Sequence, residues 1–418
     1  MKKKVRKNIK TKIFSNLIIC ILIIANCQSL KSQTKISLQA AIDTALKNNL
    51  TIKHEKLKSD YQRKIIKTSA SIPQANVTGE YGQMNSYYID NAFSISQSFN
   101  FPTVYINQKH LLSEEWKNSV MSITLKEVET KKMVRQMFFT FIYLLEKEKL
   151  LLKNDSIYGS FLEKANLRLT KGESNILEKT TAEAQRGNIA IQLKQLQQDI
   201  IITQLQIGII LNSTTAFLPV ESVKKLNLEV SSDSSLINQH PLLKMMEQQK
   251  KIALINRKLE KSKLFPDFSL GYNNMTMKGT GSDNKTYNYS TRFQSVQVGL
   301  GIPLFFGAQK AKISASKVNQ SISENSYLIE KNLLQNQFQT ILRQYQTNLE
   351  TVTYYETTAL KNAKLINVTA DKQFINGEIN YLDWVMLTNQ AINIESNYLD
   401  AVKNLNETII QINYLLSK

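Results

Sequence analysis

The chain has few of the residues that interrupt helices and few of those that bind metals. Only 13 Gly, 6 Pro, 2 Cys and 3 His occur among its 418 residues. Scarce Gly and Pro predict few turns and long helices, although the length alone suggests two or three compact domains. Three scattered histidines disfavour a multi-histidine or cysteine-rich metal site. The hydrophobic fraction of 42% is sufficient for an ordered structure.

Acidic residues are also fewer than basic ones, and part of the excess of Lys and Arg lies in one segment. The formal charge is +19, and residues 1–32 contain eight Lys and Arg but no acid. Their basic start precedes a short apolar run over 13–25, which predicts a secretory signal peptide at 1–32. A retained membrane anchor and lipidation of Cys27 stay open as alternatives. Cleavage would remove both cysteines and leave a charge of +11, spread over solvated helix faces, so we expect no nucleic-acid partner.

The remaining chain repeats itself at an offset of 205 residues. Residues 167–175 align with 372–380, and the apolar positions 93, 95 and 99 align with 298, 300 and 304. We therefore expect a first structural repeat at 33–212 and a second at 236–418. The polar stretch at 213–235 is the predicted inter-repeat segment, which we call the equatorial segment.

Alternating apolar and polar residues appear in the middle of each repeat. Val296, Val298 and Leu300 are separated by Gln297 and Gly299, and Phe93 and Ile95 flank Ser94 in the same way. This period of two predicts strands with one apolar and one polar face. Each repeat thus contains one predicted β-hairpin, at 74–101 and at 267–304.

Long helices are predicted on both sides of these hairpins. Residues 308–376 contain neither Gly nor Pro, and a helix of that length would extend about 100 Å. Gly172 and Gly377 stand where the chain can turn back, so each repeat ends in a long helical hairpin with its tip at 172 or 377. The predicted fold class is mainly α, with four strands per chain. From the residues alone, a soluble α+β domain and a membrane β-barrel closed by several chains are both possible.

Four spaced stretches resemble the TolC family of outer-membrane efflux proteins. They are 36–49 (ISLQAAIDTALKNN), 262–270 (SKLFPDFSL), 301–307 (GIPLFFG) and 377–383 (GEINYLD). The resemblance implies a homotrimer with a 12-stranded β-barrel in outer-membrane lipid and an α-helical tunnel in the periplasm. It implies a passive channel that works with a periplasmic adaptor protein and an inner-membrane pump, of the resistance-nodulation-division class. Residues 377–386 are similar to the heavy-metal branch of the family.

The same resemblance assigns two kinds of site. Asp383 matches an acidic gate residue that narrows the channel, and Met386 stands three residues on, where some members carry a second Asp. Trp384, beside them, indicates a partly apolar constriction. The adaptor would dock at the two tips, on Gly172, Glu173, Leu177, Gly377, Glu378 and Leu382.

Other classes of function have less support. A soluble periplasmic coiled-coil scaffold or adaptor would use the same long helices and is the alternative. An exported enzyme is not expected, because no nucleophile elbow, phosphate loop or metal-ligand spacing occurs in the sequence. We therefore expect no catalytic residues, no metal site and no cofactor.

Overall fold

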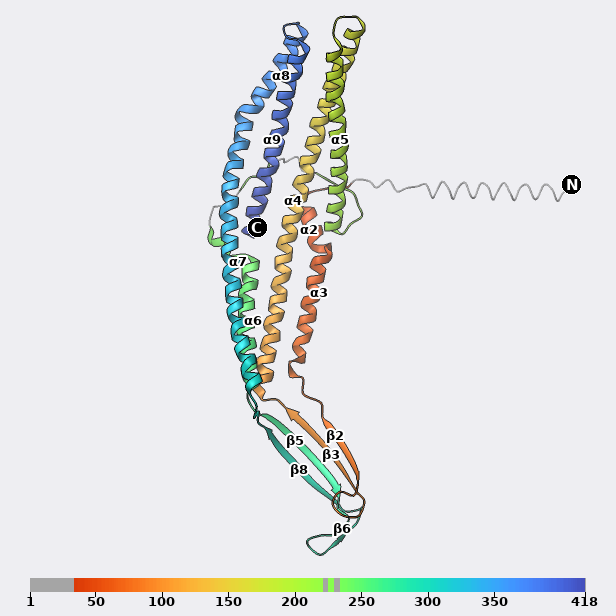
Figure 1. Cartoon of the computed structure of the whole chain (residues 1–418), viewed down its shortest axis with the longest axis vertical. Helices are drawn as coiled ribbons and strands as arrows, with labels where there is room; N and C mark the ends of the chain where they lie inside the picture. The colour runs from red at the N-terminus through yellow and green to blue at the C-terminus, as the bar shows by residue number, and fades with distance from the viewer. Residues whose placement is uncertain (1–33, 221–224, 229–233, 418) are drawn as a thin grey trace, which may run out of the picture. The chain divides into compact units, whose positions relative to one another are not determined.

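The computed structural model describes residues 34–220, 225–228 and 234–417 (Figure 1). The predicted signal peptide and Cys27 lie outside the described residues. The chain divides into two compact units. Of the described residues, the first unit contains those up to Lys47 and those within Met133–Leu226 and Thr351–Asn406. The second unit contains those within Asn48–Lys132, Asn227–Glu350 and Glu407–Lys418.

Most of the described chain is helical, as the scarcity of Gly and Pro predicts. The α-helices are α2 (Leu38–Asn48), α3 (Leu50–Ile65), α4 (Pro102–Thr170), α5 (Ile176–Leu211), α6 (Pro241–Ser262), α7 (Gly307–Tyr354), α8 (Leu360–Ile375) and α9 (Tyr381–Leu415). A single π-helical turn, Tyr355–Ala359, joins α7 to α8, so the long Gly-free stretch stays helical but is not one regular α-helix. Pro102 begins α4, where its fixed φ fits and its missing N–H costs no hydrogen bond.

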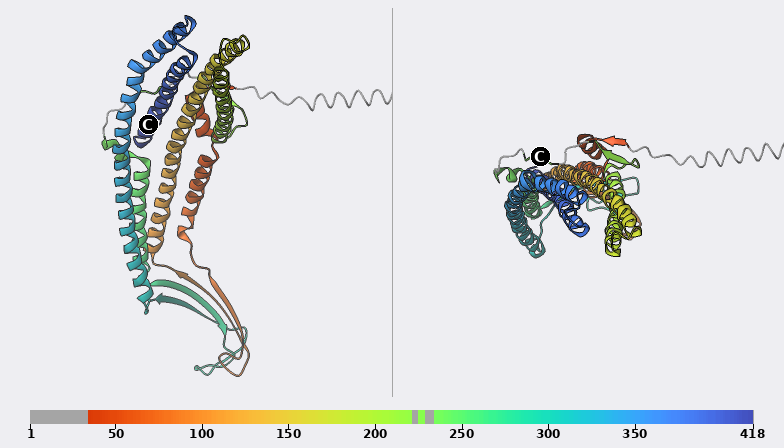
Figure 2. Two further views of the ribbon diagram at one scale, coloured as in Figure 1. Left: turned by 45° about the horizontal axis from the view of Figure 1, so that its top comes forward. Right: turned by 90° about the horizontal axis from the view of Figure 1, so that it is seen from above.

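Four strands form one antiparallel sheet in the second unit. They are β2 (Asn76–Gly82), β3 (Asp90–Phe99), β5 (Asp267–Thr276) and β8 (Arg292–Gly301), in the order β2-β3-β5-β8 (Figures 1 and 2). Two sequential hairpins therefore meet at the β3–β5 pair, where Ile95 lies opposite Tyr272. β8 ends at Gly301, short of the apolar alternation that continues to Leu304, because Pro303 has no N–H for a ladder. Two short strands, β6 (Gly279–Thr280) and β7 (Thr286–Tyr287), pair within the second hairpin loop.

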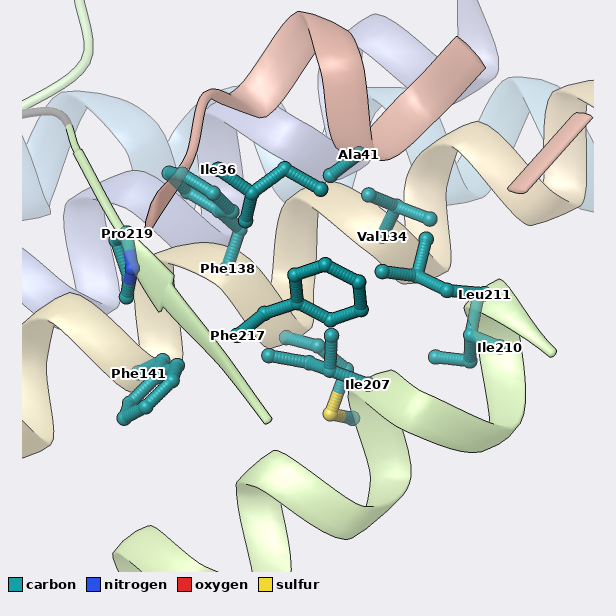
Figure 3. A pocket seen from close by; sticks show the side chains of 11 residues that line it. Ile36, Ala41, Val134, Phe138, Phe141, Ile207, Ile210, Leu211, Phe217 and Pro219 are labelled. Atoms are coloured by element: carbon teal, nitrogen blue, oxygen red, sulfur yellow. The ribbon is translucent and has the colours of Figure 1, made fainter. Parts of the chain in front are cut away.

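The equatorial segment also contributes a strand. β4 (Phe217–Pro219) pairs in parallel with β1 (Thr34–Ile36) in the first unit. Beside this pair, apolar side chains from α2, α4 and α5 enclose a small pocket (Figure 3). Its lining includes Phe138, Phe141 and Leu211, all buried, so the start of the first repeat is fixed to the segment that follows it.

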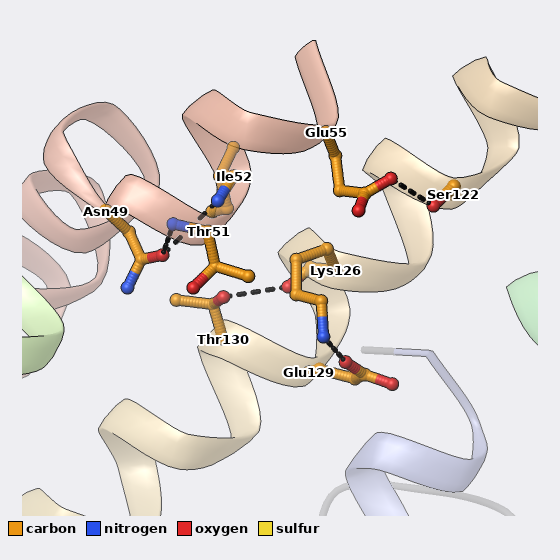
Figure 4. A network of polar contacts seen from close by, with 8 residues as sticks. All are labelled: Asn49, Thr51, Ile52, Glu55, Ser122, Lys126, Glu129 and Thr130. Carbon is orange, nitrogen blue, oxygen red and sulfur yellow. Dashed lines mark hydrogen bonds and ion pairs between the residues drawn. The ribbon is translucent and has the colours of Figure 1, made fainter. Parts of the chain in front are cut away.

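Separate apolar clusters hold the helices together in each unit. In the second unit, Ile237, Leu243, Phe338 and Ile412 pack among residues of α6, α7 and the end of α9. Polar contacts complement this packing (Figure 4). The Asn49 side chain caps α3 by accepting from the N–H groups of Thr51 and Ile52. Ser122 of α4 donates to Glu55 of α3 at 2.7 Å, and these contacts position the helices that precede the sheet.

Candidate functional site

One face of the four-stranded sheet carries most of its large apolar side chains. In register, Val77, Ile95, Tyr272 and Val296 form one row across all four strands. Neighbouring rows on this face contain Leu270 opposite Val298 and Phe268 opposite Leu300. Val296 and Val298 on this face are 76% and 74% exposed, and Val77, Leu270 and Leu300 are more than half exposed. An uncovered apolar surface of this extent marks a contact with lipid or with another protein.

The opposite face of the same sheet is lined mainly by small and polar residues, with Met275 and Phe293 towards its loop end. Ser94, Ser96 and Ser98 of β3 pair with Asn273, Gly271 and Ser269 of β5, and the β8 partners there are Ser295, Gln297 and Gly299. The Thr78 and Ser94 hydroxyls hydrogen-bond across β2 and β3 on this face. A sheet with one apolar and one hydroxyl- and amide-lined face is suited to separate lipid from water.

Both edges of this sheet are open. β2 and β8 each have one neighbour among the described residues, so each carries a row of unpaired backbone N–H and C=O groups. In lipid each unpaired group costs several kcal/mol. Every pairing inside the sheet is antiparallel, so β2 and β8 run in opposite directions. β8 of one copy can therefore pair antiparallel with β2 of the next.

Aromatic side chains stand where the sheet meets the helices. The Phe101 ring stacks on those of Phe265 and Phe268, with centroids 4.8 and 5.9 Å apart. Phe305 is almost completely exposed in the connection to α7. Aromatic residues at the margin of an apolar band are typical of membrane–water interfaces.

The two predicted tips have the same backbone geometry. Gly172 and Gly377 have φ values of +74° and +75°, in the left-handed region. Glu173 N donates to Arg168 O and Glu378 N donates to Gln373 O, both at 2.8 Å. This pattern is a Schellman motif, in which glycine ends a helix without the strain that a side chain would add.

Beyond each tip an Asn begins the returning helix. The Asn175 side chain accepts from Leu177 N and the Asn380 side chain accepts from Asp383 N, both at 3.0 Å. Leu177 and Leu382 follow these N-caps beside the two turns, and both side chains are more than half exposed. The two repeats thus present matching tips, each with an exposed Glu and an exposed Leu.

The proposed gate residues lie on the first turns of α9. Asp383 is half-buried, whereas Met386 is 62% exposed. Met386 shares an exposed helix stripe with Leu382, Gln390, Asn393 and Asn397, which follow one another at spacings of three and four. The side chains at the tip end of this stripe are therefore apolar, and amides follow below them.

Trp384 does not belong to that stripe, which corrects its predicted role at the constriction. It is 6% exposed, and its Nε1–H donates to Asp371 Oδ1 at 2.8 Å. Its ring stacks on Phe161, with centroids 4.9 Å apart, and Phe161 also stacks on Tyr381 at 3.8 Å. Phe374 packs against the same cluster. This aromatic cluster joins α4 to α8 and α9 below the tips.

Polar contacts between α4 and α9 continue down from this cluster. Tyr158 donates to Asn389 Oδ1 at 2.7 Å, and burial raises the pKa of Tyr158 to about 12, so its hydroxyl remains a donor. Lys147 and Tyr143 both donate to Asp400. These pairs join residues more than 200 positions apart, so no local sequence signal could have identified them.

No group of three metal-ligating side chains occurs within the described ranges. A search of the helices in the same ranges finds none that is long and apolar enough to cross a membrane.

Comparisons with known proteins agree with this architecture. The family model described as outer membrane efflux protein matches residues 234–417. The structure is similar to that of CusC, a protein studied for transmembrane channel formation, with a TM-score of 0.76, 16% identity and coverage of 92% of this chain and 93% of that one. The outer-membrane channel OprN is similar with a TM-score of 0.77 and 14% identity, over 91% of this chain and 89% of that one. The Campylobacter jejuni CmeC outer membrane channel is similar with a TM-score of 0.73 and 14% identity, over 94% of this chain and 90% of that one.

At these identities the structural matches establish the fold alone, and no curated protein matches the sequence. The fold class predicted from the sequence, long helices with four membrane-type strands, is confirmed. The predicted location in the outer membrane agrees with the description of the matching family. Residues 234–417 of this chain match the family model described as outer membrane efflux protein, and the chain as a whole has the fold of outer-membrane channels.

Proposed function

We propose that three copies of this chain close one 12-stranded barrel that conducts substrates across the outer membrane. The observation that carries this proposal is the two-faced sheet with two open edges. Joining β8 of each copy to β2 of the next leaves no unpaired edge and keeps the whole sheet antiparallel. The apolar face then meets lipid, and the serine- and amide-lined face surrounds an aqueous pore.

The strand length agrees with this arrangement. β5 and β8 have ten residues each, which at about 3.4 Å per residue extend about 34 Å. Tilted by about 40°, such strands rise about 26 Å, close to the height of the apolar band of an outer-membrane barrel.

The helical hairpins would continue the pore as a tunnel in the periplasm. In this proposal the chain is a passive duct, and the energy comes from an inner-membrane pump of the resistance-nodulation-division class. A periplasmic adaptor would dock on the tips, at Gly172, Glu173, Leu177, Gly377, Glu378 and Leu382. The exposed leucines beside the turns supply apolar area for such a contact.

We further propose that Asp383 and Met386 line the narrowest part of the tunnel. Three copies of Asp383 would form a ring of carboxylates that attracts cations. Met386, on the exposed stripe of α9, would add an apolar constriction. Heavy-metal cations are the substrate class proposed, on the likeness of residues 377–386 to that branch of the family. Increased metal sensitivity of a strain lacking the gene, without increased drug sensitivity, would support this class.

Cysteine labelling tests the barrel directly. Leu270→Cys lies on the apolar face and Ser269→Cys on the polar face, one residue apart in β5. In intact outer membranes, a water-soluble maleimide should label Ser269→Cys through the pore and leave Leu270→Cys unlabelled. Equal labelling of both positions would refute the barrel. Release of the protein by carbonate washing would favour the soluble scaffold instead.

A second measurement tests the pore. The purified protein should migrate as a trimer in detergent and produce stable single-channel currents in planar bilayers. A monomer without conductance would contradict the proposal.

A further inference from the structure

The apolar face of the sheet changes character at its loop end. Thr276 pairs with Arg292 there, one row beyond Asn274. The Arg292 guanidinium donates to the Asn91 side chain at 2.8 Å and to the side chain and backbone carbonyl of Asn274. These acceptors are neutral amides, so the positive charge is oriented but not neutralised. Two of the five N–H groups of Arg292 remain available in the described structure.

A second cation is fixed close to this row. The backbone N–H of Lys278 donates to Asp90 Oδ1 at 2.9 Å, and its carbonyl accepts from the Ser86 hydroxyl at 2.8 Å. Asp90 is completely buried and also accepts from Thr276 at 3.0 Å. The loops of both hairpins thus hold the backbone of Lys278 two residues beyond the partner of Arg292.

Two tyrosine rings lie against Lys278, and two further tyrosines belong to the same end of the sheet. The Lys278 ammonium lies 4.9 Å from the ring centroids of both Tyr88 and Tyr289. Tyr81, on the apolar face at the end of β2, and Tyr87, in the first hairpin loop, are almost fully exposed. Tyrosine places an apolar ring and a polar hydroxyl together at a boundary between hydrocarbon and water.

We infer that this end of the sheet binds the phosphate of a lipid A-type glycolipid in the outer leaflet. This inference rests on the proposed function, because the barrel would place the loops on the side opposite the periplasmic helices. The acyl chains would lie against the apolar face, while Arg292 and Lys278 meet the phosphate. Arginine suits phosphate because its N–H groups match two oxygens at once. The occupant must be both apolar and anionic, which a soluble phosphate is not.

The inference is tested by lipid binding to the purified full-length protein in neutral detergent. Diphosphoryl lipid A is titrated and bound lipid is counted by native mass spectrometry, with the chemically dephosphorylated glycolipid as the reference. The Arg292→Gln/Lys278→Gln variant should bind diphosphoryl lipid A at least about tenfold more weakly than the unaltered protein. A matched variant, Lys64→Gln/Lys261→Gln, removes the same charge from exposed positions of α3 and α6 and should bind normally.

Three results would overturn the inference. They are an equal loss of affinity for diphosphoryl lipid A in both double variants, no loss of affinity in either variant, and binding of the dephosphorylated glycolipid as strong as that of diphosphoryl lipid A. Equal binding of phosphatidylglycerol would overturn the choice of glycolipid. Planar-bilayer conductance of the same samples separates the two proposals. If the Arg292→Gln/Lys278→Gln variant still forms pores while retaining full lipid affinity, the lipid site is refuted and the barrel is not.

Discussion

A single added charge should be tolerated on one face of β8 and rejected on the other. Gln297 and Val298 are neighbours in this strand, and their side chains point to opposite faces of the sheet. Val298 lies within the apolar alternation from Val296 to Leu304 and is 74% exposed. Gln297 lies opposite Gly271, which leaves room for a longer side chain on the polar face.

The cost of each substitution follows from where its side chain would lie. Val298→Arg places a guanidinium near the middle of the hydrocarbon layer, at about 2–4 kcal/mol per copy. Three copies in one barrel would lose about 6–12 kcal/mol, enough to prevent assembly of a typical protein. Gln297→Arg places the same charge in water, where this lipid penalty is absent. It would add three positive charges to the pore wall and so shift its selectivity towards anions.

The assay compares trimer yield and reversal potential for the two variants. Trimers are counted on unheated gels of outer membranes, and selectivity is measured in planar bilayers under a KCl gradient. Val298→Arg should produce few or no trimers, while Gln297→Arg should assemble normally and show a reversal potential moved towards that of chloride. Normal assembly of Val298→Arg, or equal failure of both, would show that the apolar face does not contact lipid.

Three further predictions concern the helical part. Asp383→Ala should raise single-channel conductance or weaken block by divalent cations; an unaltered pore would remove Asp383 from the gate. Gly377→Ala should destabilise the protein by about 1 kcal/mol, because alanine is strained at a φ of +75°, whereas Gly187→Ala within α5 should stabilise it, as thermal unfolding can measure. Burial lowers the pKa of His240 in the folded protein, so this imidazole binds a proton more readily in the unfolded protein. The free energy of unfolding should therefore fall as the pH drops below about 6.5, the ordinary pKa of histidine. His240→Asn should remove that fall and a matched change at exposed His54 should not; identical pH profiles for both would contradict this reasoning.

The sequence predicted local elements well, because each has a local cause. Pro102 lies at the change from strand to helix, and Pro266 lies at the change from helix to strand. Period-two alternation identified all four strands of the sheet. Gly172 and Gly377 stand at helix ends where the turn requires a positive φ, which glycine adopts without strain. Such signals depend on the conformation of a few neighbouring residues, so they can be read from one chain.

Contacts between distant segments could not be predicted in the same way. Trp384 was assigned to the constriction because it follows Asp383, but its helix phase directs it inward onto Phe161, 223 positions earlier. The pairing of β3 with β5 likewise joins the two repeats and sets the strand order, yet no turn connects those strands. An isolated sequence gives the face of each element but not its partner.

Folding and assembly must be coupled if this sheet is to enter a membrane. A single chain in lipid would carry the unpaired backbone groups of both β2 and β8, each group at a cost of several kcal/mol. A single chain in water would expose the apolar side chains of four strands, including Val77 and Leu300, to solvent. Only closure with other copies removes both costs at once. The helical hairpins differ from the sheet in having an aromatic cluster and polar contacts within one chain. We therefore expect the helices to fold first and the strands to become ordered on the membrane as the trimer closes.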